Sequence, residues 1–370
     1  MNMKIIHLSY AHITDFSDPN AWLKRINFFV ALVEQMAREA EVKSIHCINY
    51  SGIINRNGVE YHFLKRHKLQ LWIPYGLHQY VRNLGPNVII VHGIAFPWQV
   101  LWLYWQLGNK VRIVVQHHSE IPLGHYKGLL QRIADHFISA YFFPSIDQAR
   151  PWAAKGQIGS LSKVHEVMEV PSVFHIIDKK QALSRTNVTS EITYLWVGRL
   201  DENKDPLTLI KGFIKFARSN PRVGLYIIYQ REELIEAVRK LLVECGNVSE
   251  QIFLVGKVRH EDLLYWFNSA DFIVSTSHYE GMGVAVCEAM SCGCIPILTE
   301  IAPFKKMTNN GAFGLHIKPG DHDDLDAVLE KSLLLNLETQ REKTLDYYRS
   351  NLSSEAISGK MLSVVKDLPG

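Results

Sequence analysis

The run VGRLDENKDP at Val197–Pro206 holds two basic residues, Arg199 and Lys204. The apolar residues before it predict a strand, and the Asp-Pro pair at its end predicts the N-cap and first position of a helix. We therefore expect both cations in the loop after the strand, close to a helix N-terminus. Such a position is typical of anion binding. The alternative for Arg199 is a surface ion pair with Asp201 or Glu202.

A second run, YEGMGVAVCEAM at Tyr279–Met290, holds two carboxylates, Glu280 and Glu288. It follows another predicted strand and predicts a second turn into a helix, at the same edge of the sheet. Gly281 and Gly283 permit positive φ and let a ligand approach the backbone without a Cβ in the way. A diphosphate between the two runs would meet the two cations and backbone N–H groups. The carboxylates would then accept hydrogen bonds from ribose and sugar hydroxyls.

Short apolar runs alternate with longer amphipathic runs, which indicates βαβ units and parallel sheets. In the first half we expect a helix at Ala21–Ala40 and strands at Lys4–Leu8, Val42–Ile48, Val88–His92, Val111–Gln116 and Ala140–Phe143. In the second half we expect strands at Thr193–Val197, Gly224–Tyr229, Ile252–Val255, Phe272–Ser275, Ile295–Leu298 and Gly314–Ile317. The helices expected there are Pro206–Arg218, Glu232–Glu244, His260–Ser269, Val284–Ser291, Asp323–Leu334 and Glu338–Arg349. The polar segment Lys179–Ser190 predicts a linker between the halves.

These elements predict an α/β fold of two Rossmann-like, doubly wound parallel-sheet domains facing a central cleft. Ligands in such sheets sit outside the carboxyl ends of the strands. The length of 370 residues also favours two domains. No apolar run is long enough for a transmembrane helix. The apolar part of the N-terminus is too short for a signal-peptide core. Five cysteines, an odd number, are typical of reduced thiols in a cytoplasmic protein.

Charge is distributed unevenly along the chain. Residues 1–185 carry 20 Lys and Arg against 12 Asp and Glu, and residues 186–370 carry 20 against 25. The first half also holds 13 of the 17 histidines and six of the eight tryptophans. A basic, aromatic-rich half indicates an anionic or membrane-bound partner, or a solvated basic surface. The basic residues of Lys65–Lys68, followed by apolar residues up to Tyr75, offer a candidate contact with an anionic membrane or a lipid-linked acceptor.

The two runs in the second half together resemble a known family pattern. In the donor domain of family 4 of the retaining, two-domain (GT-B) glycosyltransferases, which belong to glycosyltransferase group 1, G-R-L-x(3)-K-D/x-P precedes E-G-x-G-x(4)-E. Gly198–Pro206 and Glu280–Glu288 match these motifs in the same order. The next residues, Ala289–Ile297 (AMSCGCIPI), are similar to the family's following helix and strand. The resemblance covers roughly Ile192–Leu334.

The resemblance implies roles for individual residues. Arg199 and Lys204 would neutralise the donor diphosphate as the leaving group gains charge. Glu288 would bind the ribose hydroxyls, and Glu280 would contact hydroxyls of the transferred sugar. The backbone of two loops would complete the donor site, through Gly281, Met282, Gly283 and Val284 beside the sugar and through Gly256 and Val258 at the base.

The first domain offers a third candidate. The run VQHHSE at Val115–Glu120 follows a predicted strand and is similar to the family's active-site histidine position. Register favours His118, with His117 as the alternative, and the implied role is to contact the sugar and the developing charge rather than to act as a simple base. Two loops depart from the family: Ser9–Thr14 and Tyr229–Arg231 lack the usual glycines. The resemblance therefore predicts no contacts for those loops.

Other clusters favour structural interpretations. Asp321, Asp323 and Asp324 precede a predicted helix, where acids cap and favour the dipole. Cys292 and Cys294 lack partners at zinc spacing and indicate close packing between a helix and a strand. We expect no metal and no cofactor, in keeping with the family.

The resemblance thus implies a retaining glycosyltransferase that moves a sugar from a UDP-, GDP- or ADP-sugar to a hydroxyl acceptor in polysaccharide, lipopolysaccharide or glycolipid biosynthesis. Residues 1–175 would form the acceptor-binding domain and 190–350 the donor-binding domain, with a helix in 351–370 packed back on the first. The acceptor would be a saccharide or lipid-linked, with no nucleic acid as partner. The location would be the cytoplasm or the inner face of the membrane. Two alternatives are a nucleotide-sugar epimerase of the same fold and a non-catalytic protein that binds sugar nucleotides.

Overall fold

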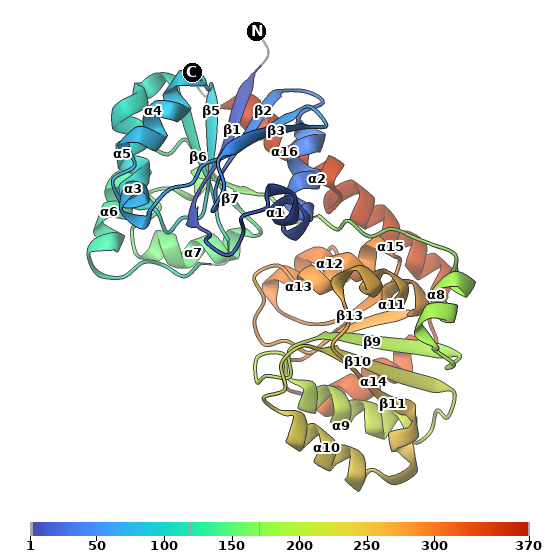
Figure 1. Ribbon diagram of the computed structural model, residues 1–370. Helices are drawn as coiled ribbons and strands as arrows, with labels where there is room; N and C mark the ends of the chain where they lie inside the picture. Colours follow the sequence, from blue (N-terminus) through green and yellow to red (C-terminus); the bar gives the residue numbers. More distant parts are fainter. Residues whose placement is uncertain (1–2, 119, 170, 369–370) are drawn as a thin grey trace. The chain divides into compact units, whose positions relative to one another are not determined.

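The computed structural model describes residues 3–118, 120–169 and 171–368. The chain divides into two compact units, which Figure 1 shows coloured along the sequence. Unit 1 comprises Met1–Pro171 together with Ser354–Gly370, and unit 2 comprises Ser172–Ser353. Each unit is built around its own sheet, as the alternation of apolar runs predicts.

The described residues of unit 1 form an eight-stranded sheet of order β3-β4-β2-β1-β5-β6-β7-β8. Its strands are β1 (Lys4–His12), β2 (Glu41–Cys47), β3 (Gly52–Arg56), β4 (Val59–Phe63), β5 (Val88–His92), β6 (Arg112–Gln116), β7 (Ala140–Phe143) and β8 (Val164–Glu166). Its helices are α1 (Pro19–Arg25), α2 (Asn27–Met36), α3 (Lys68–Trp72), α4 (Tyr75–Asn83), α5 (Pro97–Leu107), α6 (His125–Asp135), α7 (Ile146–Ala154) and α16 (Ser354–Asp367).

Unit 1 departs from the sequence expectation in several places, one of which is the short strand β8, which was not expected. The single helix expected at Ala21–Ala40 is two helices, α1 and α2, because Ile26 leaves the helical region (φ −108°, ψ 32°). The strands β3 and β4 were not expected. They form an antiparallel hairpin whose turn residues Asn57 and Gly58 both have positive φ, as a tight hairpin turn requires. The segment Ser9–Thr14, expected as a loop, mostly continues β1, where Ser9 pairs with His92.

The C-terminal helix α16 lies in unit 1 and packs against α2. Its buried residues Ile357, Met361 and Val365 belong to the same apolar core as the first strand. The guanidinium of Arg112 donates to the carbonyl oxygens of Val365 (3.1 Å) and Leu368 (3.0 Å). The last helix is therefore an integral layer of unit 1, although it is about 180 residues away in sequence from the rest of that unit.

Unit 2 is a six-stranded, fully parallel sheet of order β11-β10-β9-β12-β13-β14. Its strands are β9 (Ile192–Gly198), β10 (Val223–Tyr229), β11 (Ile252–Gly256), β12 (Phe272–Ser275), β13 (Ile295–Thr299) and β14 (Leu315–Ile317). Its helices are α8 (Lys179–Thr186), α9 (Pro206–Ala217), α10 (Ile235–Glu244), α11 (Leu263–Ser269), α12 (Val284–Ser291), α13 (Ala302–Met307), α14 (His322–Ser332) and α15 (Leu337–Asn351). In Figure 1, α9 and α10 cover one face of this sheet and α11 and α12 the other.

The segment Lys179–Ser190 is not the linker that its polar composition predicts. It forms the helix α8, in which Asp178 caps the N-terminus by accepting from the backbone N–H of Gln181 (3.0 Å). Asn187 ends the helix in the left-handed conformation (φ 54°). The small residue Ala182 is buried, and α8 packs on α11. Composition alone missed this helix because its apolar face is narrow, and the caps and the packing stabilise it.

Strands β9 and β12 are direct neighbours at the switch point of the parallel sheet of unit 2. Strand order runs outward from this pair in both directions. Because the strands are parallel, the loops that follow β9 and β12 leave from the same edge of the sheet. This edge is the ordinary ligand-binding position of such folds.

Candidate functional site

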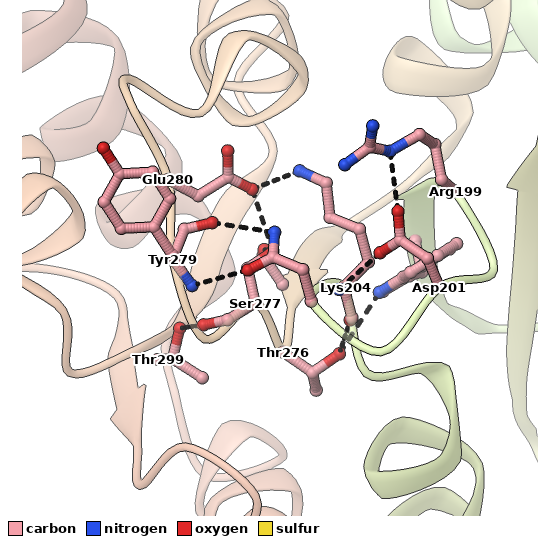
Figure 2. A network of polar contacts seen from close by, with 11 residues as sticks. Arg199, Asp201, Lys204, Thr276, Ser277, Tyr279, Glu280 and Thr299 are labelled. Atoms are coloured by element: carbon pink, nitrogen blue, oxygen red, sulfur yellow. Dashed lines mark hydrogen bonds and ion pairs between the residues drawn. The ribbon is translucent and has the colours of Figure 1, made fainter. Parts of the chain in front are cut away.

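The loop after β9 holds Arg199 and Lys204 in place by a carboxylate between them. Asp201 accepts from the backbone N–H of Lys204 through Oδ1 (2.9 Å) and pairs with Arg199 Nε through Oδ2 (2.8 Å). Figure 2 shows the guanidinium of Arg199 above Asp201. This is the ion pair that the sequence offered as the alternative for Arg199. The arginine is nevertheless only half-buried, so its charge stays accessible to a ligand.

The loop after β10 supports this segment. The backbone N–H of Leu200 donates to the carbonyl of Arg231 (3.0 Å), and that of Leu234 donates back to the carbonyl of Leu200 (2.9 Å). The atypical residues Tyr229–Arg231, which lack the family's glycines, thus lie against the loop that carries Arg199. Backbone hydrogen bonds from this segment therefore support the loop that carries Arg199.

Lys204 and Glu280 come together across the two loops. Lys204 Nζ forms an ion pair with Glu280 Oε1, to which Ser277 Oγ also donates (2.8 Å). Both side chains of the pair are largely buried, and Figure 2 shows them pointing toward one another. A partly desolvated pair of this kind has a well-defined geometry, because separating the two groups would leave a buried charge without a partner, which costs free energy. Ser277 is a site residue that the sequence analysis missed, although it stands three residues before Glu280.

Hydrogen bonds between side chains and the backbone connect the two loops. Thr276 Oγ1 donates toward the carbonyl oxygens of Lys204 (2.8 Å) and Asp205 (2.9 Å). The amide of Asn203 donates to the carbonyl of Tyr279 (3.0 Å) and its oxygen accepts from the N–H of the same residue (3.1 Å). A network of hydrogen bonds between the two loops therefore fixes the positions of Lys204 and Glu280 relative to each other.

The two helix N-termini at this edge differ. Asp205 is the N-cap of α9, with Pro206 at the first position, as predicted, and its carboxylate accepts from Thr208 N (3.1 Å) and contacts His278 Nε2 (3.1 Å). The first turn of α9 thus already holds a carboxylate. At α12, Gly283 is the N-cap and provides no side-chain cap bond.

Only one of the two glycines in the second run needs its conformational freedom. Gly283 has φ 70° and ψ 55°, and a Cβ there would lie 2.5 Å from Phe304 Cε1. Gly281 does not adopt positive φ, so of these two glycines only Gly283 uses the conformational freedom that both permit. Of the residues between and beside them, Met282 is buried and Val284 is exposed at the start of the helix.

Glu288 forms a second polar group with a residue that sequence reasoning missed. It is buried on α12, and its Oε1 contacts His260 Nε2 at 2.7 Å. The ring of His260 lies 5.0 Å from that of Phe174. His260 follows the predicted base loop, where Gly256 ends β11 with φ 79° and Val258 is partly buried. A histidine directly after this loop, at the start of a predicted helix, is the signal that could have identified it.

In unit 1, His118 rather than His117 reaches the surface after β6. His117 is buried, its Nε2 donates to the carbonyl of Glu120 (2.8 Å), and its ring stacks on Phe143 (4.4 Å between centroids). His118 pairs through Nδ1 with Glu169, and its side chain is 31% exposed. Burial lowers the pKa of His118, but the hydrogen bond to Glu169 and its negative charge raise it, and the net shift is upward.

A row of three histidines extends inward from His118. His118 Nε2 lies 3.1 Å from His92 Nδ1, and His92 Nε2 lies 3.0 Å from His7 Nδ1. The rings are stacked, with centroids 5.3 Å apart at each step. Burial lowers the pKa of His92 far below its usual value and that of His7 to about 3, so both inner rings stay neutral. Both ring nitrogens of His118 therefore have a hydrogen-bond partner. This arrangement fits a role in stabilising charge better than it fits a role as a general base, which would need a free ring nitrogen.

The remaining clusters are structural. Asp321 caps α14 by accepting from the backbone N–H groups of Asp323 (3.1 Å) and Asp324 (2.9 Å), as expected. Cys292 and Cys294 are buried and free, and burial raises the pKa of Cys292 to about 12. Within the described ranges, no group of three His, Cys, Asp or Glu residues is arranged to hold a metal ion. Among the same residues, no helix has the length and apolar character needed to cross a bilayer.

Comparisons with known proteins agree with this geometry. Residues 178–350 match the family model described as glycosyl transferases group 1. A GDP-mannose:cellobiosyl-diphosphopolyprenol alpha-mannosyltransferase of Xanthomonas oryzae is 26% identical over 261 residues, 69% of this chain. The match covers 66% of that relative, slightly less than two thirds of its length.

Solved structures share the fold over nearly the whole chain. A glycosyltransferase from Rickettsia africae superimposes with a TM-score of 0.74 at 12% identity, covering 99% of this chain and 98% of the other. An Anabaena protein solved with UDP gives a TM-score of 0.70 at 14% identity, covering 99% and 100%. At these identities the likeness shows the fold, and the predicted pair of parallel-sheet α/β domains of the GT-B type is confirmed.

Proposed function

Since residues 178–350 match the family model of the group 1 glycosyltransferases, we propose that this protein transfers a sugar from a nucleoside-diphosphate sugar to a hydroxyl of a lipid-linked saccharide. The observation that carries the proposal is the pairing of Lys204 with Glu280 across the loops after β9 and β12, beside Arg199. This pairing supports the proposal, because it brings two cations and a carboxylate to the edge of a parallel sheet at which such folds bind their ligands. Retention of configuration and membership of family 4 are parts of the same proposal.

Arg199 and Lys204 would bind the donor diphosphate. Charge builds up on the departing phosphate in the transition state, so cations fixed in advance lower the barrier more than they tighten ground-state binding. Lys204 is already oriented by Glu280, and Arg199 by Asp201. Each charge-assisted contact is worth ~1.5–3 kcal/mol, enough for roughly one to two orders of magnitude in rate.

The carboxylates would bind hydroxyl groups. Glu280, held by Ser277 and Lys204, would accept from hydroxyls of the transferred sugar and orient it, rather than attack it. Glu288 would accept from the ribose hydroxyls, and His260 beside it would fix the direction of the carboxylate. Backbone N–H groups of Gly281–Val284 would lie beside the sugar and phosphate, and Gly256–Val258 would present backbone to the base.

The first unit would bind the acceptor, with His118 contacting the sugar and the developing charge. The Xanthomonas relative is named for a diphosphopolyprenol-linked acceptor and for GDP-mannose. We extend this to a diphospholipid-linked saccharide as acceptor in this protein. The basic and aromatic residues of Lys65–Tyr75 would then hold unit 1 at the inner face of the membrane as a peripheral contact. The reaction would need no metal, because lysine and arginine supply the charge that a cation would otherwise provide.

The proposal is tested first by donor binding. Thermal shift against UDP-, GDP- and ADP-sugars, beginning with GDP-mannose, should show stabilisation by one donor class, because ligand binding raises stability by RT ln(1 + [L]/Kd). Transfer to a diphospholipid-linked saccharide should then release the nucleoside diphosphate. Conversion of the donor without acceptor, followed by NMR, would instead indicate an epimerase. Tight donor binding without turnover across lipid-linked acceptors would indicate a non-catalytic protein.

A further inference from the structure

Unit 1 contains an apolar pocket that the donor chemistry does not use. Its volume is about 450 Å³, and its walls come from the end of α3, the start of α5 and the start of α6. Trp72, Phe96, Trp98 and Tyr126 form most of the lining, with Lys127 beside them. The volume falls in the range of roughly 300–1,000 Å³ that small-molecule sites occupy. All of these residues belong to one compact unit.

Hydrogen bonds hold Trp98 and the end of α3 at the pocket. Trp98 stacks near Trp72 (centroids 6.3 Å apart, 29° between planes), and its Nε1 donates to the carbonyl of Trp72 at 2.9 Å. One turn of α3 is also tied to α5, since Gln99 Nε2 donates to the carbonyl of Leu71 (3.2 Å). Trp98 is therefore already ordered, and a ligand that enters the pocket does not lose binding energy by ordering that side chain.

The rim of the pocket is apolar and accessible. Trp72 is 59% exposed and Tyr126 is 68% exposed, and Leu69 on α3 and Leu129 on α6 are exposed beside them. Aromatic side chains normally bury most of their surface. Exposed apolar side chains around a pocket indicate that a hydrophobic ligand or surface binds there and buries them.

The same region is strongly basic. Residues 61–134 contain eight lysines and arginines and a single acidic residue, Glu120. Lys65, Lys68 and Lys127 have no carboxylate partner among residues 3–118, 120–169 and 171–368. Of these three cations, Lys127 lines the apolar recess. A cation at this position complements an amphiphile that joins a long hydrocarbon chain to an anionic head.

We infer that this pocket binds the prenyl chain of the diphosphate-linked acceptor, with its diphosphate near Lys127. The inference rests on the proposed function, and it names the part of the acceptor that unit 1 holds. A bilayer by itself needs only the exposed rim, whereas the recess between the rim residues accommodates a single chain. Chain binding in the pocket would present the saccharide headgroup from a fixed position and so reduce the entropic cost of the reaction.

The test measures binding of geranylgeranyl diphosphate, below its micelle-forming concentration, through the fluorescence of the pocket tryptophans. Inorganic diphosphate and geranylgeraniol separate the contributions of head and chain. Ala95→Phe fills the pocket from its wall, and we expect it to weaken binding of the diphosphate lipid at least tenfold. Tyr126→Ser, at the exposed rim, is a second variant in case the larger side chain impairs folding. Lys127→Ala should weaken the diphosphate lipid more than the alcohol.

Two controls make the outcome decisive. Leu69→Ser, on the exposed face outside the lining, should leave binding of the monomeric lipid unchanged while reducing co-sedimentation with anionic vesicles. Equal affinity of the wild type, Ala95→Phe and Tyr126→Ser would overturn the inference, and loss of vesicle binding alone would assign the face to the bilayer. Donor-induced thermal shift is measured on every variant, so failure of the proposed donor activity is recognised separately from failure of prenyl binding.

Discussion

At the scale of residues, the candidate donor site consists of charges that already have partners. Lys204 is bound to Glu280, Arg199 to Asp201, and Glu288 to His260. A ligand must therefore share or exchange these contacts. This favours an anionic ligand that also carries hydroxyl groups, because the phosphates can take the cations while the hydroxyls take the carboxylates.

Removing the cations should affect the rate more than binding. We expect Arg199→Ala and Lys204→Ala each to lower kcat/KM for transfer by one to two orders of magnitude, since each removes a contact that strengthens as the diphosphate departs. Lys240→Ala, which removes an exposed cation on α10, is the matched control and should leave kcat/KM unchanged. Steady-state kinetics with the donor found by thermal shift measures this. Turnover of Arg199→Ala equal to wild type would exclude its assigned role.

The partner of His118 sets its titration. Glu169 raises the pKa of His118 above the ordinary value against the effect of burial, so Glu169→Gln should lower that pKa below about 6.5. The pair stabilises unit 1 most at pH below the unfolded pKa, and that stabilisation is lost as pH rises through the folded pKa. Histidine ring signals followed by NMR titration report the shift. An unchanged pKa in the variant would contradict control by Glu169.

At the scale of elements, the site depends on a turn that allows only glycine. The N-cap of α12 has φ 70°, and Phe304 closes the space where a Cβ would stand. The start of α12 is in turn the part of the backbone that we propose lies beside the phosphate or sugar of the donor.

Gly283→Ala should therefore destabilise unit 2 by ~1–3 kcal/mol and weaken donor binding, through backbone strain and the contact with Phe304. Gly281→Ala is the matched control, because Gly281 does not use the left-handed region and the cost should be smaller. Denaturant unfolding and donor-induced thermal shift measure the two effects. Equal stability of both variants would show that the turn relaxes freely.

At the scale of the whole molecule, the two units should respond differently to acid. Unit 1 buries His7, His46 and His78, whose pKa values burial lowers to about 3, together with His92. Above pH 6.5 these rings are neutral in both folded and unfolded chains and have no effect on stability. Below it the unfolded chain takes up protons that the folded unit cannot, at ~1.4 kcal/mol per pH unit for each histidine.

We therefore expect the unfolding transition of unit 1 to move to lower temperature as pH falls from 6.5 toward 4. His46→Phe should reduce this dependence, since it removes one of the buried rings. Calorimetric scans across this pH range, with donor present to mark unit 2, measure both transitions. A transition of unit 1 that does not change with pH would show that the buried rings take up protons in the folded state.

The sequence by itself determined much of the local structure. Apolar periodicity located most strands of both sheets, and Asp205-Pro206 fixed the start of α9, because caps and burial patterns are local properties. The polar segment at α8 and the hairpin β3–β4 were misjudged or missed, because packing on α11 and pairing with β2 stabilise them. Propensity carries no information about such partners.

For the candidate site, the sequence supplied the residue types and the tertiary structure decided their partners. Motif spacing identified Arg199, Lys204, Glu280 and Glu288 as candidates. In the structure the two sequence runs that hold them follow neighbouring strands, β9 and β12. Only the folded chain joins Lys204 to Glu280, Glu288 to His260, and His118 to the two histidines behind it. These pairs are separated by 26 to 85 residues in sequence. The order of strands in the sheets and the packing of the loops bring these residues together. The spacing of the residues along the chain does not encode these contacts.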